Sequence, residues 1–172
     1  MKYLQNIFLT LFLTLAGGCT MAEPEQICLM SAVSGQLVKD GQPLANTKLV
    51  RELSYVYKDG FHTDEAVTDA EGNFSFPAVF ENKKRYAFLN AFTIAQSIEV
   101  KKPDQDINIW LGNKNEAAEN SEGRGKSIQG LICDIDRKQR LTKRIGQSYF
   151  GMLCDWDVES DPEPDYGLSE DY

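Results

Sequence analysis

Closely spaced turn signals are the feature that most constrains the fold of this chain. Asp40-Gly41 and Asp59-Gly60 are dipeptides that reverse a β-hairpin, and the segment from Asp69 to Gly72 is a third turn. The residues between these turns are β-branched, aromatic and often alternating, and no long segment repeats its apolar residues with the period of a helix. Turns at such short intervals predict an all-β sandwich or barrel.

The expected strands lie between these turns. Gly35 interrupts the first strand and indicates a β-bulge or a point of close backbone approach. Phe74 and Phe76 are two residues apart, so both side chains point into one core. We predict a single antiparallel β-sandwich, formed by residues 26–111 and completed by residues 127–156. Its strands are expected at residues 27–38, 47–57, 61–68, 74–76, 86–90, 94–100, 107–111, 127–135 and 149–156.

Two segments depart from the strand pattern. Residues 112–126 are rich in Asn, Glu, Gly and Lys and carry almost nothing to bury, which predicts a long exposed loop. Residues 137–145 are strongly basic, and Leu141 and Ile145 lie four residues apart, a spacing that predicts a short basic helix. For residues 137–156 as a whole, the sequence leaves both helix and strand open.

Two stretches of the first half resemble a known β-sandwich. Residues 35–46 read Gly-Gln-Leu-Val-Lys-Asp-Gly-Gln-Pro-Leu-Ala-Asn, and residues 68–76 read Thr-Asp-Ala-Glu-Gly-Asn-Phe-Ser-Phe. They are similar to the carboxypeptidase regulatory-like, or transthyretin-like, domain, which implies a sandwich module and no particular activity. The run from Cys133 to Asp136 resembles a small family of Gram-negative envelope proteins, and that resemblance also implies no activity.

The N-terminus has the pattern of an export signal. Lys2 supplies a positive charge, residues 4–15 are mostly apolar, and small residues follow at once. The apolar run is short for a membrane span. We therefore expect the mature protein to lie in the cell envelope, on the periplasmic side.

The end of this signal predicts a lipid anchor. The run from Leu15 to Cys19 is similar to the lipobox of bacterial lipoproteins, so residues 1–18 are expected to be removed and Cys19 to be lipidated. By the same resemblance, Thr20 after the cysteine suggests the outer membrane. Cleavage after Ala22 is the alternative, and it would leave the protein without an anchor.

Three cysteines remain after the signal, which allows at most one internal disulfide. Cys133 with Cys154 would close a loop of about 20 residues. Cys28 with Cys133 is the main competing pair, because both lie in strand-like runs. No pair has the C-x-x-C spacing of a thioredoxin-type or zinc site.

Charge is distributed unevenly along the chain. The formal net charge is −8, and residues 155–172 contain eight acidic residues and no Lys or Arg. Residues 157–172 have almost no aliphatic side chains, which predicts a disordered acidic tail. The acidic charge favours a basic protein partner and argues against nucleic acid, which requires a positive surface. The candidate partner-binding residues are Asp155, Asp157, Glu159, Asp161, Arg137, Arg140 and Arg144.

Catalytic and metal sites have little support in the sequence. His62 is the one histidine, and no Gly-x-Ser-x-Gly motif supplies a nucleophile. The alternating carboxylates that begin at Asp155 lack the glycine and the final glutamate of a calcium loop. We therefore expect no enzyme activity, no cofactor and no metal site.

These features predict an envelope protein that acts by binding. The leading hypothesis is an immunity-type inhibitor, which binds and neutralises a toxin enzyme that acts in the periplasm. The alternative is a structural or accessory lipoprotein that binds glycan or an assembly partner. A glycan- or protein-binding surface would use exposed aromatic side chains, and the candidates are Tyr55, Tyr57, Phe61, Tyr149, Phe150 and Trp156, at least half of which are expected to pack in the core.

Overall fold

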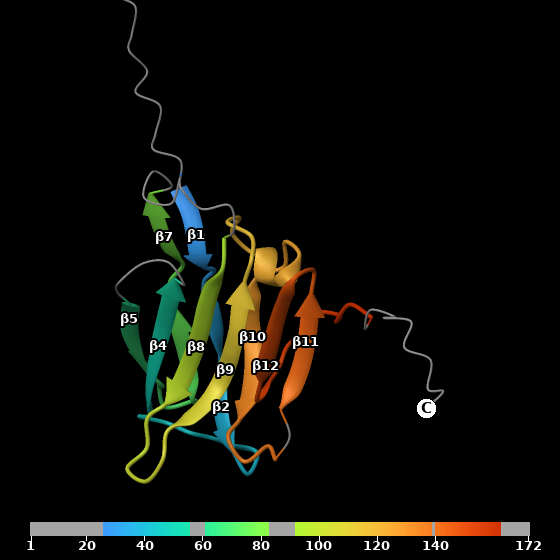
Figure 1. Ribbon diagram of the computed structural model, residues 1–172. Coiled ribbons are helices and arrows are strands. Elements are labelled where there is room, and N and C mark those ends of the chain that lie inside the picture. The colour runs from blue at the N-terminus through green and yellow to red at the C-terminus, as the bar shows by residue number, and fades with distance from the viewer. Residues whose placement is uncertain (1–25, 56–60, 83–91, 139, 163–172) are drawn as a thin grey trace, which may run out of the picture.

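The computed structural model describes residues 26–55, 61–82, 92–138 and 140–162. Within these ranges the chain is mostly strand, as Figure 1 shows. The elements are β1 (Gln26–Met30), β2 (Val33–Lys39), β3 (Gln42–Pro43), β4 (Lys48–Tyr55), β5 (Phe61–Val67), β6 (Asn73–Phe76), β7 (Val79–Asn82), β8 (Ile94–Val100), β9 (Ile107–Lys114), the 3-10 turn η2 (Ser121–Gly123), β10 (Ile128–Asp134), β11 (Leu141–Ile145), β12 (Ser148–Met152) and β13 (Cys154–Asp155).

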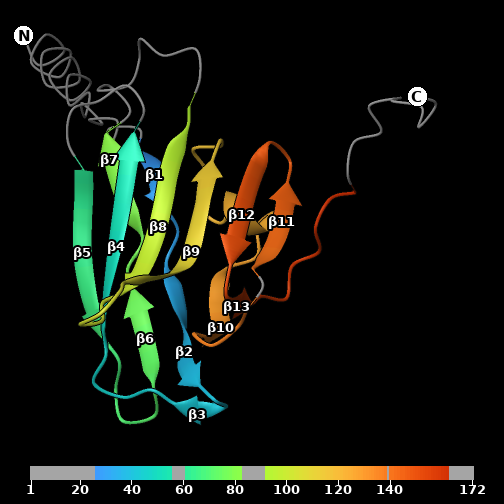
Figure 2. The same ribbon diagram turned by 60° about the horizontal axis from the view of Figure 1, so that its bottom comes forward.

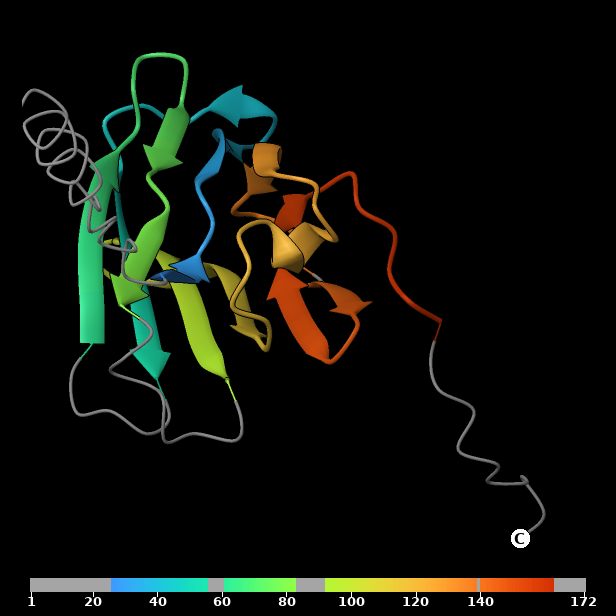
Figure 3. The ribbon, with the colours of Figure 1, turned by 90° about the horizontal axis from the view of Figure 1, so that it is seen from above.

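Two sheets face each other across a common core. The large sheet has the order β11-β12-β9-β8-β4-β5, and the small sheet has the order β13-β10-β2-β3, with β6 also paired to β2. β1 and β7 form a separate two-stranded ribbon. Seen from above, β2 and β6 lie in one layer, and β4, β8 and β9 lie in the other (Figure 3). The prediction of an all-β sandwich is confirmed.

One strand pair departs from the predicted antiparallel arrangement. β10 runs parallel to β2, with Cys133 opposite Leu37. A parallel neighbour needs a long crossover, and the seven strands between β2 and β10 supply it. The second half of the chain thereby joins the sheet that the first half began.

The alternation of apolar residues places the core between the sheets. Phe74 and Phe76 of β6 are both buried, as their spacing predicts. At the other end of the core, the Trp110 ring lies 5.2 Å from Phe150 and 5.4 Å from Trp156, centroid to centroid. Phe150 and Trp156 are therefore core residues and are not available as the aromatic binding surface considered from the sequence. Of that set, Tyr149 is exposed, and the side chains of Tyr55, Tyr57 and Phe61 lie outside the described residues.

The first turn signal forms as predicted. Asp40 and Gly41 have φ values of 50° and 72°, and they join β2 to β3 through the pair Lys39 and Gln42. A two-residue hairpin loop with positive φ at both positions matches the right-handed twist of its strands, and Asp-Gly is a favoured sequence for it. The Asp59-Gly60 turn and the strand expected at residues 86–90 lie outside the described residues.

Gly35 is a point of close approach, as expected. A Cβ at this position would lie 2.6 Å from both Cβ and the carbonyl oxygen of Leu131 on β10. The register of β10 against β2 also shifts between Ile128 and Leu131, so the close approach coincides with an irregularity of the pair. Only glycine lets the two strands meet at this spacing.

Replacing Gly35 by Ala should therefore destabilise the fold by about 1–3 kcal/mol, the usual cost of overpacking. Gly151→Ala is the matched control, because a Cβ at that strand glycine would meet its nearest neighbour at 3.8 Å. We expect the control to change stability by less than about 0.5 kcal/mol. Urea denaturation followed by tryptophan fluorescence measures both variants, and equal effects would contradict the close approach.

The predicted basic helix at residues 137–145 is wrong. Leu141–Ile145 is strand β11, which forms a hairpin with β12 through the pair Ile145 and Ser148. Residues four apart share a face on a strand as well as on a helix, so the spacing of Leu141 and Ile145 fits both. Pairing with β12 makes this segment a strand.

The predicted exposed loop at residues 112–126 is also wrong in two respects. β9 continues to Lys114, and the side chains of Lys114 and Glu122 are fully buried against each other. Charged residues are poor candidates for burial when each is considered alone. The segment buries these two charges because they form an ion pair.

Two further boundaries differ from expectation. Residues 27–38 form two strands, β1 and β2, which separate at Ser31. Of the predicted disordered tail, residues 157–162 are described and lie beside β11 (Figure 2), with Val158 buried. Residues 163–172, the signal at residues 1–18 and the lipidation candidate Cys19 lie outside the described residues.

Candidate functional site

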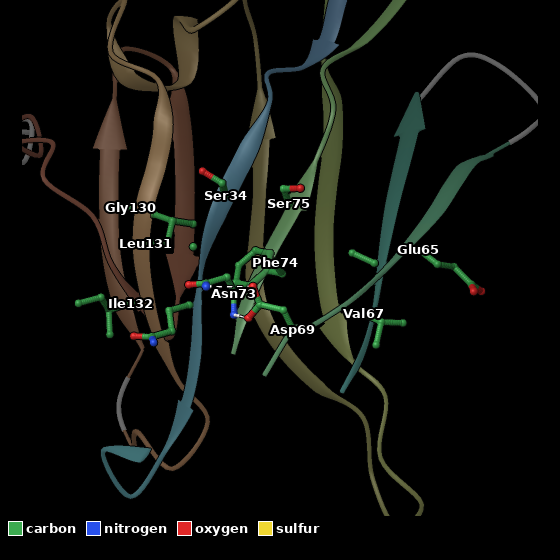
Figure 4. Close-up of a pocket in the computed structure, with 13 residues that line it drawn as sticks. Ser34, Glu65, Val67, Asp69, Asn73, Phe74, Ser75, Gly130, Leu131 and Ile132 are labelled. Carbon is green, nitrogen blue, oxygen red and sulfur yellow. Dashed lines mark hydrogen bonds between the residues drawn. The ribbon is translucent and has the colours of Figure 1, made fainter. Parts of the chain in front are cut away.

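An open groove lies along one side of the sandwich, where an edge of the large sheet meets the small sheet. It encloses about 790 Å³. Residues 65–67 of β5 line one side, residues 73–75 of β6 and 34–36 of β2 form its floor, and residues 130–132 of β10 close the other side. Figure 4 shows the labelled side chains spread across these four strands and the turn between β5 and β6, which carries Asp69.

The groove combines exposed aliphatic residues with small polar ones. Val67 and Ile132, on its two opposite sides, are 63% and 50% exposed. Between them lie side chains that carry hydroxyl or amide groups, among them Ser34, Asn73 and Ser75. Apolar residues surrounded by polar ones are the usual composition of a protein-binding surface.

The carboxylate of Asp69 lies on the rim of the groove and is held there by its own turn. It accepts hydrogen bonds from the side-chain amide of Asn73 at 3.0 Å, and from the backbone N–H groups of Asn73 at 2.7 Å and Glu71 at 3.0 Å. These hydrogen bonds, the Asn73 side chain first, lower the pKa of Asp69. The rim therefore keeps a negative charge at neutral pH.

A second, smaller hollow of about 370 Å³ adjoins the groove on the far side of Ile132. Gly130 and Ile132 line both hollows, and the charged side chains that line the second are Asp155, Asp157 and Lys143. We call the two hollows together the groove face. An exposed aliphatic residue, Ile132, thus lies between two groups of carboxylates.

Several of the predicted partner-binding residues contact one another. Arg137 Nη2 lies 2.6 Å from Asp155 Oδ2, and Arg140 Nη1 donates to the Gly151 carbonyl at 3.5 Å. Asp157 and Glu159 have exposed side chains. The basic and acidic blocks, distinct in sequence, therefore meet within the chain.

Residues 158–161 cover the free edge of β11. Asp161 N–H donates to the Arg144 carbonyl at 2.7 Å, and Arg144 N–H donates to Ser160 Oγ at 3.0 Å. The Asp161 carboxylate accepts from Gly146 N–H at 2.7 Å and forms an ion pair with Arg124. Of the predicted acidic binding residues, Asp161 and Asp155 are thus both engaged within the chain, and Asp155 and Asp157 line the second of the two hollows.

A buried polar cluster behind the β1–β2 junction was missed by the sequence interpretation. Glu122 accepts from Lys114 Nζ at 2.8 Å, from Ser31 Oγ at 2.7 Å, from Ser31 N–H at 3.0 Å and from Gln96 Nε2 at 3.2 Å. Burial would raise the pKa of Glu122, but the charge of Lys114 and these hydrogen bonds outweigh it and lower the pKa. The cluster is inaccessible to solvent, so we assign it a structural role.

A second buried charge, also missed, lies at the groove end of the core. The Arg51 guanidinium is fully buried, donates to Asp64 through Nε at 2.8 Å and through Nη2 at 2.5 Å, and lies over the Phe76 ring. His62 Nε2 is 3.8 Å from Asp64 Oδ2. Asp64 thus belongs to a structural ion pair with Arg51, and His62 lies beside that pair.

The cysteines pair as the leading prediction states. Cys133 and Cys154 form a disulfide across the β10–β13 pair, and Cys28 is free and buried. Burial raises the pKa of the Cys28 thiol. The competing Cys28–Cys133 pairing is therefore wrong.

Among the described residues, no group of three or more His, Cys, Asp or Glu side chains could hold a metal ion. Within the same ranges, no helix has the length and apolarity needed to cross a membrane.

A family described as "Domain of unknown function (DUF6795)" matches residues 33–138. The chain belongs to this family. The matched range of the DUF6795 domain runs from β2 to just beyond β10, so it contains every residue that lines the larger hollow and both members of each buried ion pair. No curated protein and no solved structure matches the chain.

Proposed function

We propose that this chain is a non-catalytic binding protein of the cell envelope, and specifically an immunity-type inhibitor that neutralises a toxin enzyme acting in the periplasm. The observation that carries the proposal is the groove face, which places exposed Ile132 and Val67 among the carboxylates of Glu65, Asp69, Asp155 and Asp157. Glu65 and Asp155 pair with Lys48 and Arg137, but ion pairs at the surface are weak, so a basic partner can replace these cations. Carboxylates beside exposed aliphatic side chains accelerate association with a basic partner and disfavour acidic ones.

Two further elements belong to this proposal. The likeness to the carboxypeptidase regulatory-like domain is supported by the Asp40-Gly41 hairpin and by the buried pair Phe74 and Phe76. Export and anchoring through Cys19 would hold the groove face in the periplasm, where it could meet an incoming enzyme.

Ile132→Arg is the variant that tests this surface, and Leu111→Arg is its matched control. The two residues are 50% and 51% exposed on strands β10 and β9, which belong to opposite sheets. A bulky cation in place of Ile132 should remove the exposed aliphatic side chain and repel a basic partner, so we expect at least a 100-fold loss of affinity. The same change at Leu111 should leave affinity within about threefold.

The partner is obtained by capture of the tagged mature protein from its own cell envelope, with mass spectrometry of the bound proteins. We expect a single stoichiometric exported enzyme that salt releases and that Ile132→Arg fails to retain. Recovery of glycan or envelope assembly proteins alone would overturn the immunity proposal. It would favour the accessory lipoprotein in its place.

A further inference from the structure

The two edges of the large sheet differ in how their backbone groups are used. Arg144, on the edge strand β11, has both its N–H and its carbonyl bonded by residues 160 and 161 of the same chain. β5 is the opposite edge, and it pairs with β4 alone among the described residues. One edge is therefore bonded at Arg144 by the chain's own tail, and the other presents a full strand.

The register identifies which β5 backbone groups point outward. Lys101 N–H donates to the Lys48 carbonyl at 2.9 Å, so the Lys48 backbone faces β8. Because these directions alternate along a strand, the backbones of Leu49, Arg51 and Leu53 face β5. They pair there with Ala66, Asp64 and His62, and the backbone N–H and carbonyl groups of Thr63, Glu65 and Val67 point away from the sheet.

We propose that an extended basic segment of the protein partner adds to β5 as a seventh strand of the large sheet. The inference rests on the proposed function and specifies how the partner binds. Main-chain hydrogen bonds to an exposed edge provide affinity in this mode, and pockets for alternate side chains provide specificity. The groove supplies such a pocket, because residues 65–67 of β5 form one of its walls and residues 73–75 of β6 form the adjoining floor.

The charges at this edge select a basic segment. Asp64, Glu65 and Asp69 supply three carboxylates here, against the two cations Lys48 and Arg51 that pair with Glu65 and Asp64. The Lys48–Glu65 pair is exposed, and exposed ion pairs are weak, so a basic side chain of the partner can take the place of Lys48. A second copy of this chain fits less well. Antiparallel pairing centred on Asp64 or on Glu65 would place like charges opposite each other, which is unfavourable in a sheet.

Amide hydrogen exchange by NMR tests the proposal on the mature chain. In the free protein, Thr63, Glu65 and Val67 should exchange at least 100-fold faster than Asp64 and Ala66. An octapeptide of alternating Lys and Val, added in excess, should slow those three amides at least tenfold. A peptide with Glu in place of Lys should not. Arg144 N–H should be unaffected, because Ser160 already binds it.

Glu65→Lys should abolish the effect of the basic peptide, whereas Glu119→Lys, the same charge change at an exposed residue of the loop after β9, should preserve it. Exchange that slows with protein concentration in the absence of peptide would assign the edge to a second copy and overturn the proposal.

Repeating the exchange measurement with the captured partner distinguishes a failure of strand addition from a failure of the inhibitor function. If the captured enzyme does not slow exchange at Thr63, Glu65 and Val67, strand addition is overturned and the inhibitor function stands. If the basic peptide binds but no enzyme is captured, the inhibitor function is overturned.

Discussion

Glu122→Leu is expected to lower the free energy of unfolding by about 3–5 kcal/mol, because it leaves the Lys114 ammonium charged, buried and without its counter-ion. The substitution also removes the acceptor of Ser31 and Gln96, both fully buried. Such a loss is a large share of the stability of a domain this size. Urea denaturation at neutral pH, followed by tryptophan fluorescence, measures it.

Two controls isolate the buried pair. Glu119→Leu changes an exposed residue of the same loop and should cost less than about 0.5 kcal/mol. The double variant Lys114→Met, Glu122→Leu should recover much of the loss, since an apolar pair can replace a buried ion pair. A double variant no more stable than Glu122→Leu would contradict the pairing.

The same pair predicts a pH dependence. Because the pKa of Glu122 lies below its ordinary value of 4.5, its carboxylate contributes stability that is present above pH 4.5 and is lost as the pH falls further. Wild-type protein should therefore lose more stability between pH 5 and pH 3 than Glu122→Gln does. Parallel stability curves for the two proteins would contradict the lowered pKa.

Removing the Cys133–Cys154 disulfide is expected to lower the free energy of unfolding by about 3 kcal/mol. The two cysteines are 21 residues apart in the sequence. Without the bond, the unfolded chain regains the conformational entropy of this loop and becomes more favourable relative to the folded state. Denaturation of the Cys133→Ser, Cys154→Ser double variant, and of wild-type protein with and without reductant, measures it. The bond also joins β10, which carries Ile132, to β13, which carries Asp155, so we expect partner binding to weaken with it.

Cys28→Ser serves as the control for this experiment. Cys28 is free, so its variant should keep the full sensitivity to reductant that wild-type protein shows. If Cys28→Ser were itself insensitive to reductant, the bond would involve Cys28, and the pairing with Cys154 would be wrong.

Local chemistry explains which parts of the fold the sequence predicts well. The Asp40-Gly41 turn depends on two adjacent residues that tolerate positive φ, and the burial of Phe74 and Phe76 depends on their spacing alone. Gly35 was recognised because a glycine within a strand usually permits a close approach. Each of these inferences needs only a few consecutive residues.

The errors have a common physical origin, because each depends on which strand or side chain a residue meets in the folded chain, and the pattern of the segment itself does not specify that partner. Leu141 and Ile145 fit both a helix and a strand until β12 pairs with them. Lys114 and Glu122 resemble solvent-exposed loop residues until each is seen to neutralise the other, and Ser31, about 90 residues from Glu122, completes the site. The larger hollow of the groove face is assembled from β2, β5, β6 and β10 and has no local signature in the sequence.

The most direct test of the proposed function is a titration of the captured enzyme's turnover with purified mature protein. We predict that wild-type protein and Leu111→Arg stop turnover at a one-to-one ratio, and that Ile132→Arg at the same concentration leaves it at the uninhibited rate. An enzyme that keeps turning over when saturated with wild-type protein, or that Ile132→Arg inhibits as well as wild type does, would contradict inhibition through the groove face.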